Sequence, residues 1–501
     1  MRYLFLFVFA LSVFACNSDG SPPPPAMAPL AELPIIPLPY EMTSAEGHFF
    51  SDGESGWDVP DEDTDVALAT ATAVDYLQAR GVTPFPFSVA IEKLPGLPAG
   101  AYLLNISPEA VSMIAGDEAG ILNAAITLDQ VAAFSGKSDR GLFLPCGTIT
   151  DQPRFAYRGY MLDIARTFFG VDTIKQVIDR IAPYKINHLH LHLSDDQGWR
   201  IEIKSWPKLT EIGGKTEVDG TPGGYLTQED YAEVVNYAGR RGITIVPEID
   251  VPGHIHAALV AYPELSIDGK DRELYTGTEV GFSTVDANKD VVYEWFDDVV
   301  REISALTPGP YFHLGGDESS VTPHDDYVKF VRRAQQIIRD NGKRPMGWDE
   351  VAVAGLAEGA VAQLWNHVEY AELARDNGNQ VLVSPGTRTY LDMQYDTASR
   401  IGLHWAAYIE VDSAYLWDPA TFVPNVTDED ILGVESPLWG ETIRNIEDID
   451  YLTFPRLPAH AEVGWTAQEK RDYPDFLRRL KAHQVWLKEQ GIGTYDTRVL
   501  R

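Results

Sequence analysis

The chain has 501 residues, of which 45% are hydrophobic and 23% charged, a composition typical of globular proteins. Its formal net charge is −34, from 74 acidic and 40 basic residues, so its surface repels phosphate backbones and nucleic-acid binding is not expected. The two cysteines, Cys16 and Cys146, are too few for a disulfide framework. The length suits one large domain with a smaller second one.

Residues 1–16 are predicted to be a targeting segment. Arg2 supplies a positive charge, and residues 3–15 form an almost wholly apolar run that is too short to span a bilayer. The run ends at Cys16 and resembles a bacterial lipoprotein signal, in which the cysteine is lipidated. An ordinary secretory signal with an incidental cysteine is the alternative. We expect an exported protein, periplasmic or on the cell surface and lipid-anchored to a bacterial membrane. The proline-rich residues 17–32 would then form a tether.

Residues 33–150 are predicted to form a small α+β domain. A strand is expected at 102–106. A helix is expected at 118–134, because its apolar residues recur at three- and four-residue spacings, as in a helix with one buried face. No catalytic constellation is evident in this part, so it is predicted to be non-catalytic.

Residues 151–501 alternate short apolar runs with helical patterns. Helices are predicted at 171–184, 227–240, 288–306 and 325–341, and strands at 159–163, 186–193, 244–249, 311–314, 345–348, 360–364, 381–384 and 432–437. Eight strands with intervening helices favour a (β/α)8 barrel. A doubly wound open sheet is the alternative, but no glycine-rich phosphate turn follows any of the strands.

Charged and aromatic residues follow almost every predicted strand. A lone aspartate at such a place usually caps the next helix, but a whole set at the strand ends predicts an active site, which barrels build at that rim. Several tryptophans among carboxylates favour a sugar, because indole faces stack on pyranose C–H faces and carboxylates bind hydroxyls. His188, His190 and His192 share one strand face, yet no zinc-type spacing accompanies them. We therefore expect these histidines to fill the barrel interior and predict neither a metal nor a cofactor.

Four motifs at successive strand ends resemble family 20 glycoside hydrolases, the β-N-acetylhexosaminidases. They are RGYMLD at 158–163, HLHLSDDQGWR at 190–200, PEIDVPGH at 247–254 and HLGGDE at 313–318. The resemblance extends over the barrel and the preceding α+β domain. It implies a retaining exo-β-N-acetylhexosaminidase that removes terminal GlcNAc or GalNAc from oligosaccharides such as chitooligosaccharides. In this family the acetamido oxygen of the substrate is the nucleophile, and an oxazolinium intermediate forms.

The resemblance also implies a role for each site residue. Glu318 would be the general acid/base, and Asp317 would orient the acetamido group and stabilise the oxazolinium ring. Tyr390 would bind the acetamido oxygen. Asp195 and His254 would support Glu318. The expected substrate-binding residues are Arg166, Asp392 and Glu441 for the sugar hydroxyls, Trp348, Trp365 and Trp439 for the acetamido pocket, and Trp405 for the next sugar.

Two other functions stay open at this level. A sugar-binding protein without activity would keep the tryptophans and Arg166 but lose the acid, whereas both Asp317 and Glu318 are present. A transglycosylase would share the same site, because only competition between water and a sugar acceptor separates the two outcomes. The Asp-x-x-Asp-x-Asp-x-Glu spacing of chitinases is absent.

Overall fold

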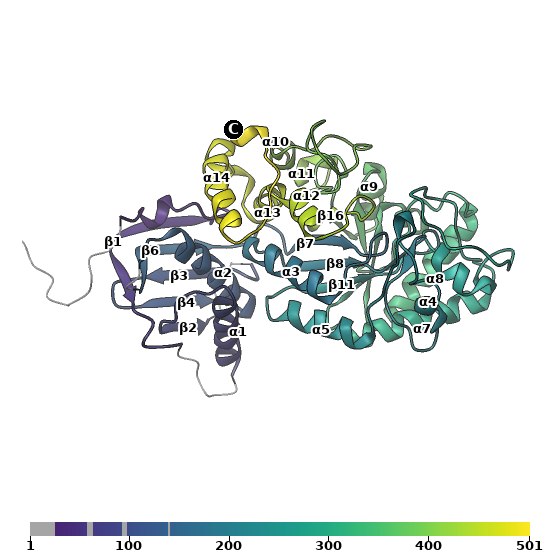
Figure 1. Ribbon diagram of the computed structural model, residues 1–501, viewed down its shortest axis with the longest axis horizontal. Coiled ribbons are helices and arrows are strands. Elements are labelled where there is room, and N and C mark those ends of the chain that lie inside the picture. The colour runs from purple at the N-terminus through teal and green to yellow at the C-terminus, as the bar shows by residue number, and fades with distance from the viewer. Residues whose placement is uncertain (1–25, 58–63, 93–97, 139–140) are drawn as a thin grey trace, which may run out of the picture.

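The computed structural model describes residues 26–57, 64–92, 98–138 and 141–501. It has two parts joined end to end: an N-terminal sheet with helices and a larger barrel (Figure 1). Among the described residues, no helix is both long and apolar enough to cross a membrane. The predicted signal segment with Cys16, and most of the predicted tether, lie outside the described residues.

The N-terminal part is a mixed sheet in the order β1-β6-β3-β4-β2, with β5 paired to β6. Its elements are η1 (Leu30–Glu32), β1 (Glu41–Ser51), α1 (Asp65–Ala79), β2 (Phe87–Ile91), β3 (Tyr102–Ile106), β4 (Val111–Ala115), α2 (Glu118–Phe134), β5 (Lys137–Ser138) and β6 (Gly141–Asp151). The helix predicted at 118–134 is confirmed as α2. The expected single buried face is wrong, because the residues from Gly120 to Ala132 are all buried.

Helix α2 is buried all round because it lies between the sheet and the barrel. The side chain of Gln130 shows this arrangement. Its Nε2 donates to the carbonyls of Ile36 in the N-terminal part and Pro183 in the barrel, at 2.6 and 2.7 Å. A buried amide needs such partners, so α2 joins the two parts of the molecule.

The larger part is a closed barrel of eight parallel strands in the order β11-β12-β13-β14-β15-β16-β7-β8. The predicted (β/α)8 barrel is therefore confirmed, and the open doubly wound sheet is excluded. The strands are β7 (Tyr157–Asp163), β8 (His188–His192), β11 (Thr244–Glu248), β12 (Tyr311–His313), β13 (Arg344–Trp348), β14 (Val361–Leu364), β15 (Gln380–Val383) and β16 (Ile431–Leu438). A short hairpin, β9 (Ser194–Asp195) and β10 (Gly198–Trp199), follows β8.

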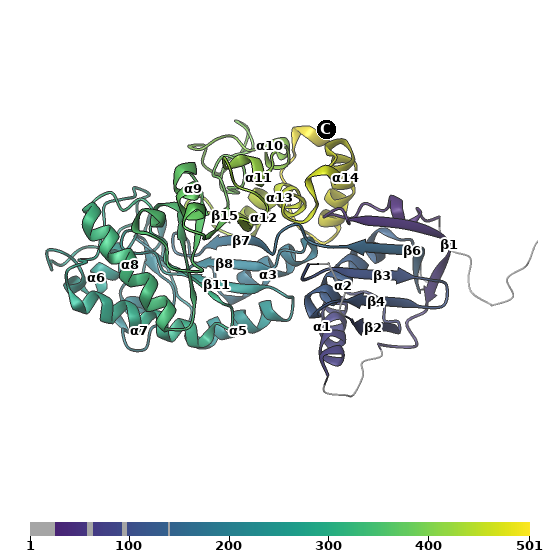
Figure 2. The same ribbon diagram turned by 180° about the vertical axis from the view of Figure 1, so that it is seen from behind.

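Helices surround the barrel, and α5, α7 and α8 are seen on its outside in Figure 2. The α-helices are α3 (Val171–Ile181), α4 (Lys208–Glu211), α5 (Gln228–Gly239), α6 (His256–Ala261), α7 (Asp290–Leu306), α8 (His324–Asp340), α9 (Val368–Asp376), α10 (Val411–Tyr415), α11 (Pro419–Phe422), α12 (Ile446–Thr453), α13 (Arg456–Trp465) and α14 (Tyr473–Glu489). Short 3-10 helices are η2 (Ala182–Tyr184), η3 (Val218–Gly220), η4 (Pro263–Leu265), η5 (Asp349–Ala354), η6 (Gln468–Lys470) and η7 (Arg498–Leu500). Only the short α10 and α11 interrupt the long segment between β15 and β16.

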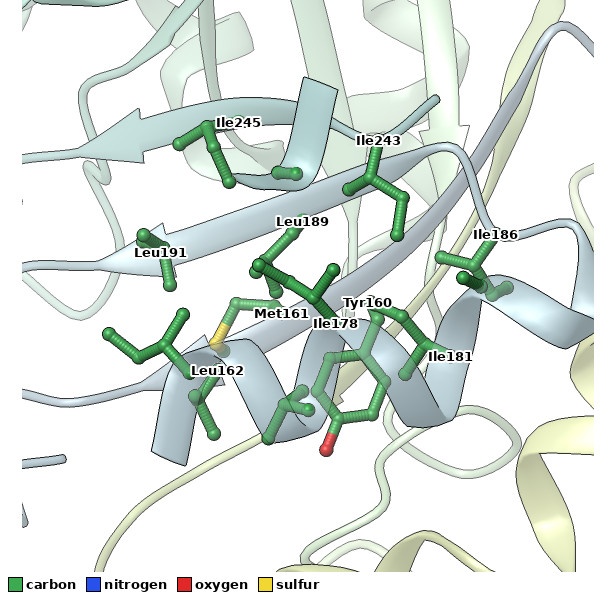
Figure 3. Packing of buried hydrophobic residues seen from close by; sticks show 14 of the residues in the cluster. Tyr160, Met161, Leu162, Ile178, Ile181, Ile186, Leu189, Leu191, Ile243 and Ile245 are labelled. Atoms are coloured by element: carbon green, nitrogen blue, oxygen red, sulfur yellow. The ribbon is translucent and has the colours of Figure 1, made fainter. Parts of the chain in front are cut away.

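The alternation of side chains along β8 separates the outer core from the barrel interior. Figure 3 shows Ile178 and Ile181 of α3 packed against the outer surface of the strands, where Leu189 and Leu191 lie. Successive residues of a strand point to opposite faces. His190 and His192 therefore point into the barrel, where both are fully buried.

Candidate active site

A cavity of about 230 Å³ lies at the C-terminal ends of the barrel strands. It is lined by Arg166, Thr278, Val280, Asp317, Glu318, Trp365, Tyr390, Asp392, Leu403, Trp405, Trp439 and Glu441. Nine of these twelve residues are among the predicted site residues. The structure thus brings together side chains from loops that are far apart in the sequence, because parallel strands of a barrel end at the same rim.

Asp317 and Glu318 both face the cavity although they are consecutive. Strand β12 has already ended at His313, and the backbone of Glu318 lies in the left-handed region, with φ of 45°. A non-glycine residue rarely adopts this conformation, and it is concentrated at functional sites. The preceding Gly315 has φ of 67°, and a Cβ there would come within 1.9 Å of the Asp250 carboxylate. The two glycines before Asp317 therefore permit the turn that carries both carboxyl groups to one side.

His254 stands between Asp195 and Glu318. Its Nδ1 is 3.2 Å from Asp195 Oδ1, and its Nε2 is 3.4 Å from Glu318 Oε2. Its backbone is also left-handed, with φ of 50°. Burial alone would lower the pKa of His254, but the carboxylates of Asp195 and Asp317 outweigh burial and raise it well above its usual value. A protonated His254 held by Asp195 can donate to Glu318, as the sequence prediction of a supporting pair requires.

Arg166 lines the cavity together with acidic neighbours. Its Nη2 is 2.9 Å from Asp195 Oδ2, and its guanidinium carbon lies 4.7 Å from the centre of the Trp439 ring. Both carboxylate oxygens of Asp392 and the Oε2 of Glu441 are buried without a hydrogen-bond partner among the described residues. Burial and Glu441 raise the pKa of Asp392 well above its usual value. These free acceptors beside a guanidinium match the hydroxyl groups of a sugar.

Aromatic rings close the other side of the cavity. Tyr390 lies 6.3 Å from Trp439 and 5.9 Å from Trp405 between ring centres, and Trp365 lies 5.9 Å from Trp405. Trp405 stands at the rim and is 56% exposed, which leaves a free ring face. Trp348 is not brought to the cavity surface. It is fully buried one layer deeper, with its ring centre 5.6 Å from that of Trp439.

Several residues near the cavity were not predicted. Thr278, Val280 and Leu403 line it from irregular loops, which give no periodic signal in a sequence. Glu350 accepts a hydrogen bond of 3.0 Å from the indole of Trp365. Burial and the adjacent Asp349 raise the pKa of Glu350 to about 8. Its position directly after the Trp348–Asp349 strand end was the one available signal.

The described residues include groups close enough to hold a metal ion, such as His190 with Glu248 and His313. In this group His190 Nε2 and His313 Nδ1 each lie 3.0 Å from an oxygen of Glu248. His313 Nδ1 also accepts a hydrogen bond of 3.1 Å from the backbone N–H of Gly315, so this nitrogen is already occupied.

Asp250 and Asp317 form a buried carboxyl pair beside the cavity. Each carboxyl lies within 4.8 Å of the other and of His254. Burial and the like charge of its neighbour raise the pKa of Asp317 well above its usual value, and burial likewise raises that of Asp250. Such a pair releases its protons in two separate steps, and the predicted role of Asp317, which is to stabilise a positive charge, requires its ionised form.

Asp250→Asn is therefore expected to move the acidic limb of the kcat/KM profile to lower pH. Activity is lost as the pH falls through the pKa of Asp317, and the neutral amide removes the like charge that raises this pKa. The measurement is kcat/KM against pH. Asp450→Asn is the control, because Asp450 is buried on α12 with a pKa raised to about 7, mainly by burial, but does not line the cavity. An unmoved acidic limb in Asp250→Asn would show that the pair does not govern the ionisation of Asp317.

Comparison with known proteins agrees with this geometry. Residues 155–468 match the model of the glycosyl hydrolase family 20 catalytic domain. The chain is 39% identical over 477 residues to a β-N-acetylhexosaminidase of Cellulomonas fimi, covering 92% of this chain and 96% of that protein. The Streptomyces plicatus N-acetyl-β-hexosaminidase in complex with thio-NAglucal has a TM-score of 0.89 at 40% identity, covering 95% of this chain and 99% of that one.

A third relative is a family 20 exo-β-N-acetylglucosaminidase from Vibrio harveyi in complex with N-acetylglucosamine. It has a TM-score of 0.82 at 34% identity and covers 94% of this chain and 80% of that one. The family model matches more than half of the chain, and the match includes every residue predicted to line the cavity. The chain belongs to glycosyl hydrolase family 20.

Proposed function

We propose that this protein is a retaining exo-β-N-acetylhexosaminidase that releases single terminal N-acetylhexosamine residues from oligosaccharides. The observation that carries the proposal is the cavity itself, in which Asp317 and Glu318 face a wall of Trp365, Tyr390 and Trp439 above Arg166. Its volume of about 230 Å³ is below the range of about 300–1,000 Å³ for drug-sized ligands. A cavity of this size suits one sugar residue rather than a chain passing through, and so supports exo action.

Each part of the cavity has a task in this reaction. Arg166, with the unpartnered oxygens of Asp392 and Glu441, binds the hydroxyl groups of the terminal sugar. Tyr390 donates its hydroxyl to the acetamido oxygen, and burial with Asp392 nearby raises the pKa of Tyr390, which keeps it protonated. Trp365 and Trp439 exclude water from the acetamido group and hold it at attack distance from the anomeric carbon.

The nucleophile comes from the substrate. In family 20 the acetamido oxygen takes the place of an enzymic nucleophile, an established property of the family. Glu318 donates its proton to the leaving oxygen as the C1–O bond breaks and the acetamido oxygen bonds to C1. Asp317 accepts the acetamido N–H and stabilises the oxazolinium charge. Glu318 then removes a proton from water, which attacks C1 and restores the acetamido group with retained configuration.

Chitooligosaccharides are the proposed natural substrates, with the exposed Trp405 as the platform for the sugar after the cleaved bond. The test is product analysis on chitooligosaccharides of increasing length together with hydrolysis of a 4-nitrophenyl N-acetyl-β-glucosaminide. We expect N-acetylglucosamine as the first product at every length, with β configuration at early times. Disaccharide release, or an inverted product, would contradict the proposal. Products longer than the substrate at low substrate concentration would instead identify a transglycosylase.

We also propose that the enzyme is exported and held on a bacterial membrane by a lipid on Cys16. The described chain begins close to the N-terminal sheet, where η1 contacts β1 and β6. Arg158 and Thr244, at the first ends of β7 and β11, line a space with Asn123 of α2. The cavity therefore opens at the end of the barrel away from the proposed anchor, facing soluble substrates. Cell fractionation checks this: Cys16→Ser should move the activity from the membrane fraction to the soluble fraction.

A further inference from the structure

Glu248, the last residue of β11, is a fully buried carboxylate with four polar neighbours within 3.0 Å. His192 Nδ1 approaches one oxygen at 2.5 Å and His190 Nε2 the same oxygen at 3.0 Å. The other oxygen accepts from the indole of Trp348 at 2.9 Å, and His313 Nδ1 lies 3.0 Å from it. Glu248 does not line the cavity, so it cannot touch substrate.

One arm of this arrangement leads to the acid/base. The Nε2 of His192 lies 2.9 Å from Asp195 Oδ2, which also receives Arg166 Nη2 at 2.9 Å. The second oxygen of Asp195 faces His254, whose other nitrogen faces Glu318. A continuous line of polar contacts therefore joins Glu248 to the group that must exchange a proton with substrate.

The other arm leads to the wall of the cavity. Trp348 donates to Glu248 and packs behind Trp439, which lines the cavity. The ring of His192 also meets Trp439 edge to face, at 5.0 Å between centres. The orientation of both rings behind Trp439 thus depends on one carboxylate.

Acidic side chains and histidines alternate along the line from Glu248 to Glu318. His190 and His192 face it from β8, His313 from β12, and Asp250 is the nearest further acid on its own loop. Burial lowers the pKa of His192, but Glu248 and Asp195 outweigh burial and raise it to about 10. Burial would raise the pKa of Glu248, but His192, His313 and His190 hold it well below its usual value.

Stability alone does not account for these buried charges. Branched apolar residues usually fill a barrel interior. Replacing a buried ion pair by apolar side chains is often neutral or stabilising, because the desolvation of two charges offsets their attraction. A carboxylate that contacts both the cavity wall and the acid/base line is better explained by the reaction.

We propose that Glu248 is a positioning residue for the reaction: it holds Trp348 behind the cavity wall and, through His192, holds the Asp195–His254 pair that orients Glu318. This inference rests on the proposed glycosidase activity. Residues that orient the ligands of metal sites change activity by about 10- to 100-fold when lost, and we expect an effect of the same order here.

The test compares Glu248→Gln with Glu435→Gln on a 4-nitrophenyl N-acetyl-β-glucosaminide. Glu435 is buried in the same barrel and bonded to the same His190 at 2.9 Å, but no contact joins it to His192 or Trp348 among the described residues. We expect Glu248→Gln to lower kcat by about 10- to 100-fold. We also expect its basic limb to move to lower pH by at least about one unit, because His192 loses the carboxylate that keeps it charged. Glu435→Gln should keep a kcat near wild type and an unmoved basic limb.

The outcomes separate the possibilities. An inactive wild-type enzyme would overturn the proposed function itself. If the wild type is active but the two variants lose kcat equally, Glu248 has only a structural role. The same conclusion follows if the basic limb of Glu248→Gln does not move. If Glu248→Gln does not melt cooperatively, His192→Asn decides, because it removes the contacts of His192 with Glu248, Asp195 and Trp439 but leaves Trp348 bonded to Glu248. For His192→Asn we expect the same loss of kcat and a shift of the basic limb in the same direction. A wild-type pH profile of this variant would overturn the proposal.

Discussion

Glu318→Gln is expected to lower kcat/KM for chitobiose by about 10²- to 10⁴-fold, the usual contribution of a positioned general acid/base. The amide keeps the size of the side chain but can neither protonate the leaving oxygen nor take a proton from water. The loss should be smaller for an aryl glycoside with an acidic leaving group, because that group needs less protonation. Steady-state kinetics on the two substrates measure the difference.

Azide provides a more specific test of the acid/base role in the Glu318→Gln variant. Azide attacks without giving up a proton, so it should restore turnover of the aryl substrate in Glu318→Gln and yield a β-glycosyl azide. Glu279→Gln is the matched control, because Glu279 is an exposed carboxylate on the loop that carries Val280. Wild-type turnover of chitobiose by Glu318→Gln would contradict the assignment of Glu318 as the general acid/base.

Asp317→Asn is expected to lower kcat for N-acetyl substrates by about 10²- to 10³-fold, the usual effect of removing one group that stabilises developing charge. The amide would offer no full negative charge to the oxazolinium ring and would present an N–H where an acceptor is required. Asp317 is only 7% exposed, so water cannot replace it.

The contrast between two substrates tests the role of Asp317 against a general loss of activity. Residual hydrolysis of a 4-nitrophenyl β-glucoside, which has no acetamido group, should fall far less in Asp317→Asn than hydrolysis of the N-acetyl substrate. Glu318→Gln should lower both. Equal losses on the two substrates in Asp317→Asn would mean that Asp317 does not act on the acetamido group.

The sequence predicted the fold well because its signals are local. All eight barrel strands were placed within two residues of their observed ends, since short apolar runs bounded by polar residues mark buried parallel strands. Most cavity-lining residues were also predictable, because residues at the ends of parallel strands share one rim. Helix α2 was placed correctly. Its burial on all sides depends on the barrel packed against it, and the periodicity of its own sequence does not report that contact.

The sequence indicated the left-handed turn at Glu318 only in part. The two glycines of HLGGDE permit an unusual backbone, but the motif does not specify which following residue adopts it. The positive φ of Glu318 and of His254, which brings their side chains within 3.4 Å, is a result of the fold around them.

The sequence by itself determined the barrel, the family and the chemical kinds of residue at the rim. Only the tertiary structure decided which of those residues face substrate and which stand behind them. Glu248 lies beside His192 because β11 pairs with β8 in one register, and it meets Trp348 of β13, two strands further round the barrel and 100 positions away in the chain. Trp348 lies behind Trp439 for the same reason. Distances of this kind depend on barrel closure and strand register, which no local pattern encodes.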